Sequence, residues 1–240
     1  MIKVENIDVW GWKHAIRGMR NPLASWDKSD SLDYCPAESD ECINCIFSEN
    51  GECTNYDAPI IGDNDLALMQ KLYKAGESHR KYLRQVFVSM DITAPLYMLK
   101  QLDTYKVGVT MNSTSTMHTI HKKEFTLDDF SHEHLIGRSW SEADNFKGIT
   151  PLENLKNTID LLNDCRKLYL FSKGTNREKM AWWQIIQSLP DSYNQLRTVT
   201  MNYENVVNII NQRRGHRLDE WNTFCDILRD LPYVKEIMNE

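Results

Sequence analysis

The spacing of hydrophobic residues predicts both strands and helices. Apolar and β-branched residues alternate with polar ones over residues 86–92, which is typical of a strand. Before this strand, apolar residues at helical spacing predict a helix that Asn64 caps. After it, Pro95 suits the first turn of a helix that we expect to run from Leu96 to about Lys106. This mixture of elements indicates an α+β fold.

Helical spacing dominates the second half of the chain. The segments Thr150–Glu153 and Thr175–Glu178 both match a capping box, in which Thr and Glu satisfy each other's exposed backbone donors. Two further helices are expected over about residues 203–214 and 218–231. No internal repeat interrupts the pattern, so we expect one helix-rich domain over residues 1–240.

Composition narrows the class of protein. The chain has 240 residues, of which 41% are hydrophobic and 26% are charged, so a core of normal size should form. The formal net charge of -6 argues against a protein that binds nucleic-acid polymers. No apolar run is long enough to span a bilayer, and the N-terminus does not resemble a signal peptide. We therefore expect a cytoplasmic protein with no membrane partner.

Residues 30–57 differ sharply from the rest of the chain. They contain many acidic residues, no Lys or Arg and few apolar residues, which predicts an acidic loop inserted in the fold. The loop holds a cysteine cluster: Cys35, Cys42, Cys45 and Cys53. The Cys-x-x-Cys pair suits one half of a zinc site, although the outer spacings match no common zinc finger. Structural zinc, reduced thiols and redox-switched disulfides all remain open.

Three cationic clusters stand out in this acidic protein. The first is a helix end followed by a polar loop, with the candidates Lys100, Gln101, Tyr105, Lys106, Asn112, Ser113, Thr114, Ser115 and His118. The second comprises His79, Arg80 and Arg84, and the third comprises Arg213, Arg214 and His216. A polar turn or a solvated helix face would explain each cluster alone. Together they suggest a site where the clusters converge on one phosphorylated ligand.

The sequence carries none of the standard catalytic fingerprints. It lacks the dinucleotide-binding glycine motif, the phosphate-binding P-loop, the His-Glu-x-x-His zinc motif and the nucleophile elbow of serine hydrolases. No catalytic residue is therefore predicted from motifs alone.

The stretch from residue 86 to residue 120 resembles the flavin-dependent thymidylate synthases. In that family a strand leads into Ala-Pro, then a helix ends in Arg-Gln, and the signature Arg-His-Arg-x-x-Ser-x-Asn-x-x-Ser-x-Arg follows. Here Ala94-Pro95 follows the strand, and Lys100-Gln101 takes the place of Arg-Gln. Thr104-Tyr105-Lys106 stands where Arg-His-Arg is expected. With one residue inserted, Asn112 and Ser115 match the Asn and the second Ser of the signature.

The resemblance extends to both sides and implies a fold, ligands and an assembly. Residues 66–84 look like the early helix of the family, with Arg84 at the position of a flavin-binding His, and residues 211–221 place Arg213 or Gln212 near a nucleotide-binding Arg. The family fold is α+β with a small central antiparallel sheet. The family assembles as a homotetramer, builds its nucleotide pockets where subunits meet, and uses FAD and folate. The chain is also similar to uncharacterised proteins of bacteriophages and prophages.

The departures from the signature decide which function we favour. Thr104 and Tyr105 carry no charge and Lys106 cannot form a planar fork, so flavin binding should be weakened. These departures fall on cofactor contacts more than on Asn112 and Ser115, which favours a nucleotide-binding protein without catalysis, holding or sequestering a nucleotide for a phage. An active flavin-dependent methyltransferase for a pyrimidine nucleotide is the second hypothesis. An oligomeric interaction protein that uses its acidic loop is the third.

Overall fold

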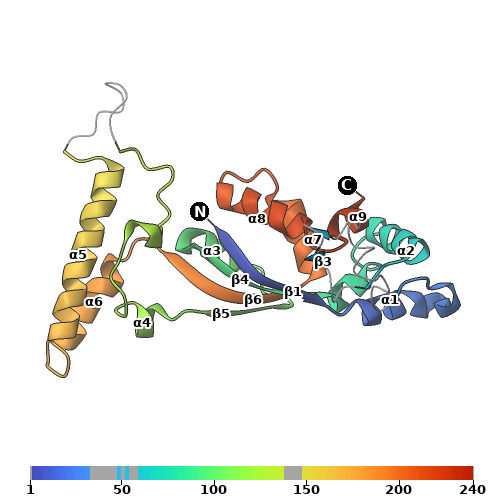
Figure 1. The fold of residues 1–240 in the computed structure, drawn as a ribbon, viewed down its shortest axis with the longest axis horizontal. Helices are drawn as coiled ribbons and strands as arrows, with labels where there is room; N and C mark the ends of the chain where they lie inside the picture. The colour runs from blue at the N-terminus through green and yellow to red at the C-terminus, as the bar shows by residue number, and fades with distance from the viewer. Residues whose placement is uncertain (1, 33–47, 50–51, 54–58, 138–147, 240) are drawn as a thin grey trace. The chain divides into compact units, whose positions relative to one another are not determined.

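The computed structural model contains a small antiparallel sheet together with helices (Figure 1). The structure describes residues 2–32, 48–49, 52–53, 59–137 and 148–239. The sheet has the strand order β1-β4-β6-β5. Its strands are β1 (Lys3–Trp10), β4 (Phe87–Pro95), β5 (Val109–Ser113) and β6 (Asn194–Asn202). The predicted α+β fold is confirmed.

The helices and the shorter elements complete the described part of the chain. The longer helices are α1 (Trp12–Arg20), α2 (Asp63–Lys74), α5 (Pro151–Phe171), α6 (Glu178–Ser188), α7 (Tyr203–Arg213) and α8 (Asp219–Arg229). The shorter elements are α3 (Leu96–Leu102), α4 (Thr116–Thr119), α9 (Val234–Met238) and the hairpin of β2 (Ser48–Glu49) and β3 (Glu52–Cys53). Among the described residues, no helix is both long and apolar enough to cross a membrane.

The chain divides into two compact units, and each strand of the sheet contributes residues to both. Unit 1 contains Met1–Lys3, Ile92–Thr104 and Asn112–Arg197. Unit 2 contains Val4–Asp91, Tyr105–Met111 and Thr198–Glu240. That residues 1–240 form a single domain stays a prediction.

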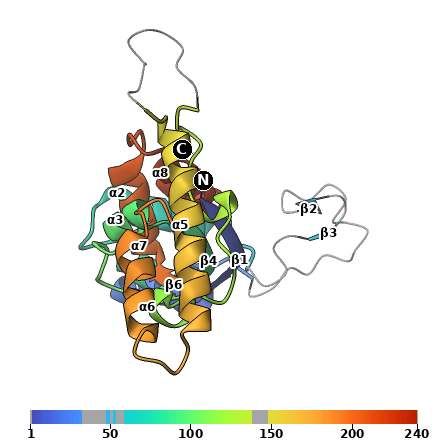
Figure 2. The same ribbon diagram turned by 90° about the vertical axis from the view of Figure 1, so that its left-hand side faces the viewer.

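In unit 1, a hairpin of α5 and α6 packs on an aromatic and aliphatic core. The two helices lie side by side in both views (Figures 1 and 2). Their buried face meets loop residues in a cluster of Ile120, Phe125, Phe130, Leu155, Ile159, Leu162 and Ile185. The predicted capping box at the start of α5 is present: Glu153 N–H donates to Thr150 Oγ1 at 3.3 Å, and Thr150 N–H donates to Glu153 Oε2 at 2.8 Å. Local sequence therefore sets where this long helix begins.

In unit 2, aromatic packing joins α1 to α7, and a buried ion pair joins α1 to α2. The Trp12 ring meets Tyr203 and Tyr233 edge-to-face, with centroids 5.1 and 5.5 Å away. Arg20 Nε donates to Asp65 Oδ1 at 2.6 Å, and both side chains are almost fully buried. Burial alone would raise the pKa of Asp65, but hydrogen bonds from neighbouring serine hydroxyls and from Arg20 outweigh it and lower that pKa. The carboxylate is thus held in its charged form.

Three predicted helix boundaries were wrong, and in each case a side-chain hydrogen bond differs from the expected one. Asn64 does not cap α2, because Asp30 accepts the N–H groups of Asn64 and Asp65 at 2.9 and 3.1 Å. The second capping box is absent: the Thr175 hydroxyl donates to the Ser172 carbonyl at 2.6 Å, and α6 begins only at Glu178. The third error was the length of α3, which ends at Leu102 instead of near Lys106.

The end of α3 and the strand β6 also differ from expectation. Thr104 Oγ1 donates to the Gln101 carbonyl at 2.7 Å, which closes the last turn of α3. Residues 194–202 form a strand within the half of the chain that was expected to be helical. Gln195, Val199 and Met201 are buried and alternate with more exposed residues, which is the period-two pattern of a strand.

Candidate functional site

A cluster of polar and aromatic side chains gathers in unit 2 around the end of α7. We call it the Arg213 cluster; it comprises Tyr105, Gln212, Arg213, His216 and Trp221. Arg213 Nε donates to the Tyr105 hydroxyl at 3.0 Å, and that hydroxyl donates to Gln212 Oε1 at 3.0 Å. The guanidinium carbon of Arg213 lies 4.7 Å from the Trp221 ring centroid and 5.6 Å from that of Tyr105. Cation–π contacts and one hydrogen bond therefore fix the plane of the guanidinium.

The turn between α7 and α8 positions His216 beside Arg213. Gly215 has φ +73°, a left-handed conformation that favours glycine, so the chain can reverse there. The backbone N–H of His216 then donates to the Arg213 carbonyl at 3.0 Å. The imidazole Nε2 lies 3.5 Å from Arg213 Nη1, and the ring meets Trp221 with centroids 6.3 Å apart. A three-residue spacing in the sequence thus becomes a side-chain contact.

Arg80, from the second predicted cationic cluster, is buried in unit 2. Its Nε donates to Glu204 Oε1 at 3.0 Å and its Nη2 donates to Asn208 Oδ1 at 2.9 Å. The guanidinium also lies over the Tyr73 ring, with its carbon 5.2 Å from the centroid. Only 8% of Arg80 is exposed, so its charge is neutralised inside the fold instead of being presented to a ligand.

The remaining predicted cations of unit 2 lie on its surface. Lys106, His79, Arg84 and Arg214 are all exposed. Lys106 immediately follows Tyr105 of the Arg213 cluster, and Arg214 follows Arg213. Lys106 and Arg214 are therefore adjacent in the chain to residues of the Arg213 cluster, whereas His79 and Arg84 are not.

In unit 1, the predicted residues at the end of α3 bond largely within the chain. Lys100 Nζ lies 2.6 Å from Asp191 Oδ2, and both side chains are more than half exposed. The Gln101 backbone carbonyl accepts the hydrogen bond from the Thr104 hydroxyl described above. Asp103 pairs with Arg197 through Oδ1 and Nη1 at 2.5 Å. The cation Arg197 was not among the predicted residues, because nothing in its local sequence distinguishes it.

The polar loop of residues 112–118 also belongs to unit 1, and its backbone forms hydrogen bonds there. Gln195 Nε2 donates to the Thr114 carbonyl at 2.8 Å, and Thr114 N–H donates to the Leu196 carbonyl at 2.9 Å. Ser115 caps α4 by accepting the N–H of His118 at 3.3 Å. The side chains of Asn112, Ser113 and His118 are exposed. The loop offers hydroxyl groups to solvent, but its backbone is committed to the sheet and to α4.

Two cavities in unit 1 are lined by polar groups. One of about 230 Å³ is bordered by Thr93, Thr114, Thr116, Tyr193 and Asn194 among others. Burial, with a smaller contribution from Asp129, raises the pKa of Tyr193, so its hydroxyl stays protonated at neutral pH.

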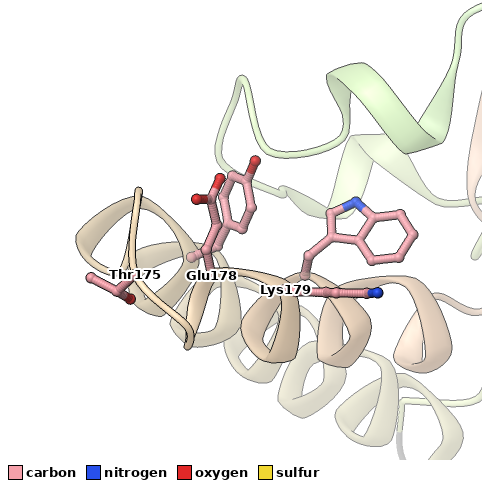
Figure 3. A pocket seen from close by; sticks show the side chains of 5 residues that line it. Thr175, Glu178 and Lys179 are labelled. Carbon is pink, nitrogen blue, oxygen red and sulfur yellow. The ribbon is translucent and has the colours of Figure 1, made fainter.

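The second cavity, of about 320 Å³, lies at the start of α6. It is lined by Thr175, Glu178 and Lys179 (Figure 3) together with Tyr169 and Trp182. Neither cavity brings the predicted cations together.

The predicted zinc site lies outside the described residues, except for the backbone of Cys53 in β3. Elsewhere in the described ranges, no three His, Cys, Asp or Glu side chains group closely enough to hold a metal ion. Burial raises the pKa of the Cys225 thiol to about 11 and also raises that of Cys165. Both thiols are therefore protonated at neutral pH and are poor nucleophiles.

Sequence reasoning missed two aromatic members of these networks. Trp221 is fully buried and supports Arg213 from α8, and Tyr73 supports Arg80 from α2. An arginine followed eight residues later by a tryptophan is a weak signal, because the contact depends on the reversal at Gly215.

No protein-family model and no curated protein matches the sequence. Solved structures do match its fold. Thymidylate synthase X (ThyX) from Helicobacter pylori with FAD and dUMP superimposes with a TM-score of 0.61, at 15% identity, over 100% of this chain and 98% of that one. A second structure of the flavin-dependent enzyme from the same organism, complexed with FAD and dUMP, has a TM-score of 0.59 at 14% identity and covers 100% and 97%.

A third match carries a different description. The UMP/dUMP methylase PolB from Streptomyces cacaoi bound with 5-Br UMP superimposes with a TM-score of 0.55, at 14% identity, over 100% of this chain and 94% of that one. The likeness to these three structures extends along the whole chain and establishes the fold that the sequence resemblance predicted. At such low identity it assigns neither ligand nor activity.

Proposed function

We propose that this chain binds a pyrimidine nucleoside monophosphate through the Arg213 cluster of unit 2, without catalysing flavin-dependent methyl transfer. The proposal draws its ligand class from the fold, because the similar structures from H. pylori and S. cacaoi contain dUMP or a UMP derivative. It draws its site from the geometry of this chain. The proposed residues are Tyr105, Lys106, Arg213, Arg214 and His216.

The observation that carries the proposal is the preorganised guanidinium of Arg213. Tyr105 and Trp221 hold its plane, and a fixed guanidinium recognises phosphate or planar oxygen acceptors better than a mobile one. Lys106 and Arg214 add positive charge next to it in the chain. Tyr105 is half-buried, and an aromatic ring of this kind can stack on a base.

The residues present do not fit a flavin. Two of the three residues that stand at the cationic triplet of the family signature, Thr104 and Tyr105, carry no charge. Their hydroxyls also bond within the chain: Thr104 to the Gln101 carbonyl and Tyr105 to Gln212 and Arg213. Each lost charge-assisted hydrogen bond costs about 1.5–3 kcal/mol of binding free energy. We therefore derive no catalytic step through a flavin.

An active flavin-dependent pyrimidine-nucleotide methyltransferase is the second candidate. It is supported by the full-length likeness to the H. pylori enzyme and by the presence of Asn112 and Ser115 at signature positions. Both candidates include the homotetramer, with pockets where subunits meet, that the family resemblance implies.

The decisive experiment combines binding with turnover. Isothermal calorimetry of the purified chain against UMP, dUMP, TMP and AMP should give micromolar binding to the pyrimidine nucleotides and weaker binding to AMP. The protein should show no flavin absorbance after incubation with FAD and desalting. Methyl transfer from methylenetetrahydrofolate, assayed with FAD and a nicotinamide reductant, should stay at background.

The possible outcomes separate the two candidates. No heat with any pyrimidine nucleotide would contradict the proposed function. Nucleotide methylation that depends on added FAD would replace it with the second candidate. Light scattering tests the assembly, for which we expect a mass about four times the 28.1 kDa of one chain.

A further inference from the structure

The cavity of about 230 Å³ in unit 1 contains hydrogen-bonding groups that the fold does not use. We call it the Tyr193 cavity; Thr93, Thr116, Tyr193 and Asn194 are among the residues that line it. The hydroxyls of Thr93, Thr116 and Tyr193 make no hydrogen bond with another described residue. The Nδ2 atom of Asn194 makes none with a described residue either. Four polar groups of one cavity are therefore open to a ligand.

The surrounding fold holds two of these groups in place. The Tyr193 ring meets Phe130 and Phe125 edge-to-face, with centroids 5.7 and 6.4 Å away, so the direction of its hydroxyl is set by packing. The Ser131 hydroxyl donates to Asn194 Oδ1 at 3.0 Å, which leaves the amide nitrogen of Asn194 as a donor. Groups that are positioned in advance bind a ligand at a lower cost in conformational entropy.

The charged residues at the Tyr193 cavity disfavour an anionic ligand. Lys123 lines the cavity, but its ammonium forms an ion pair with Asp129. Asp128 also lines the cavity and has no ion-pair partner among the described residues. One cation thus stands beside two carboxylates, and negative charge is in excess. A phosphate or carboxylate group would therefore be repelled.

The uncharged groups match a ligand that carries several hydroxyls. The Tyr193 hydroxyl is protonated at neutral pH, so it can donate and accept hydrogen bonds, as the two threonine hydroxyls can. A sugar or another polyol offers the same double capacity at each of its hydroxyls. Pockets for drug-sized ligands measure roughly 300–1,000 Å³, so this smaller cavity suits a ligand of about one ring.

We propose that the Tyr193 cavity binds a small neutral polyol of the size of one sugar ring. A free monosaccharide and the ribose of a nucleoside present this same chemistry, and the experiment below separates these two sources. All residues of the cavity belong to unit 1, whereas the Arg213 cluster belongs to unit 2. The inference does not rest on the proposed function.

The first test looks for binding by saturation-transfer difference NMR on the full chain. The probes are D-ribose, D-glucose, myo-inositol and uridine, each added at increasing concentration. We expect at least one probe to give a saturable signal at about millimolar concentration, an affinity typical of a ligand held by a few neutral hydrogen bonds. Inorganic phosphate should not displace that probe, because negative charge is in excess at the cavity.

The second test removes single hydroxyls and keeps the shape of the cavity. Thr116→Val and Tyr193→Phe should each weaken binding of the responding probe by about 5- to 10-fold. Neither hydroxyl bonds to another described residue, so the midpoint of urea denaturation should stay near that of the wild type. Thr158→Val and Tyr169→Phe are the matched controls, since both residues lie in unit 1 but do not line this cavity. They should leave binding unchanged.

Each outcome supports or overturns the inference. A signal that both cavity variants weaken supports it, and its source is a nucleoside if only uridine responds and a free polyol if ribose, glucose or inositol responds. No saturable signal with any probe would overturn it, as would displacement of the probe by phosphate. Equal losses in the control variants, or no loss in the cavity variants, would place the probe elsewhere.

The inference and the proposed function fail separately. If calorimetry shows no binding of pyrimidine nucleotides but a polyol responds to the cavity variants, the Tyr193 cavity stands and the proposed function falls. If UMP binds and no probe gives a signal that the cavity variants weaken, the inference falls and the proposed function stands.

Discussion

Two arginines are associated with helix α7, and their surroundings differ. Arg80 reaches the first half of α7, where it is buried against Glu204 and Asn208. Arg213 lies at the end of α7 and is held by the Tyr105 hydroxyl and the faces of two aromatic rings. The first arginine meets a carboxylate inside the fold, and the second is oriented by groups that fix its plane. A cation in a basic sequence cluster can therefore be buried against a carboxylate or held against aromatic rings, and only the folded structure decides which.

The largest effect is expected from breaking the buried pair. Arg80→Met should lower the free energy of unfolding by about 3–5 kcal/mol, because Glu204 would be left as a buried charge without its partner. Urea denaturation followed by circular dichroism measures this loss. The double variant Arg80→Met/Glu204→Leu should recover most of it, since no unpaired charge remains. A loss of under about 1 kcal/mol in the single variant would contradict the structural role.

The next effect concerns binding instead of stability. Arg213→Lys should weaken UMP binding by about 30- to 100-fold, because an ammonium neither stacks as a plane nor donates from a fixed fork. The midpoint of urea denaturation should move little. Arg17→Lys is the matched control, since Arg17 also lies over a tryptophan, with its guanidinium carbon 5.7 Å from the Trp26 centroid, but outside the cluster. Equal losses in the two variants, measured by calorimetry, would remove Arg213 from its proposed role.

A smaller effect isolates what orients Arg213. Tyr105→Phe keeps the ring but removes the hydroxyl that accepts from Arg213 Nε and donates to Gln212. We expect UMP affinity to fall by about 5- to 10-fold, as is typical for the loss of one hydrogen bond. Calorimetry of Tyr105→Phe beside Tyr73→Phe, whose ring supports Arg80 instead, checks this. An unchanged affinity would mean that the aromatic faces alone hold the guanidinium.

The smallest effect is expected at an exposed cation. Lys100→Ala breaks the pair with Asp191, in which both partners are more than half exposed, and should change the free energy of unfolding by about 0.5 kcal/mol or less. UMP affinity should stay within about twofold of the wild type, because the charge of Lys100 is already balanced by Asp191. A tenfold loss would extend the nucleotide site to this residue and weaken the assignment to unit 2.

Much of the fold was determined by the sequence alone, wherever the signal is local. The alternation over 86–92 predicted the core of β4, and Pro95 predicted the start of α3. The Thr150–Glu153 capping box set the start of α5, and residues 203–213 formed the expected helix. These patterns report interactions between residues a few positions apart, which a single segment can satisfy without the rest of the chain.

The Arg213 cluster is formed by contacts between residues far apart in the sequence, which local patterns do not predict. All three candidates of the third cluster were named from the sequence, but the stacking of Arg213 on Trp221 and its bond to Tyr105 were not. Arg80 also lies in a basic sequence cluster, as Arg213 does, but in the structure it is buried in an ion pair with Glu204. Phage origin, cytoplasmic location and zinc in the cysteine loop stay predictions.

The sequence by itself determined an α+β chain with its main helices, one central strand and the residues that carry charge. Only the tertiary structure decided which of those charges are buried against a carboxylate and which lie against aromatic rings or at the surface. The physical reason is distance along the chain. Asp30 accepts the N–H of Asn64 at the start of α2, and Arg213 donates to the Tyr105 hydroxyl, across separations that local patterns cannot encode. Such partners are selected by packing and burial, which exist only once the chain has folded.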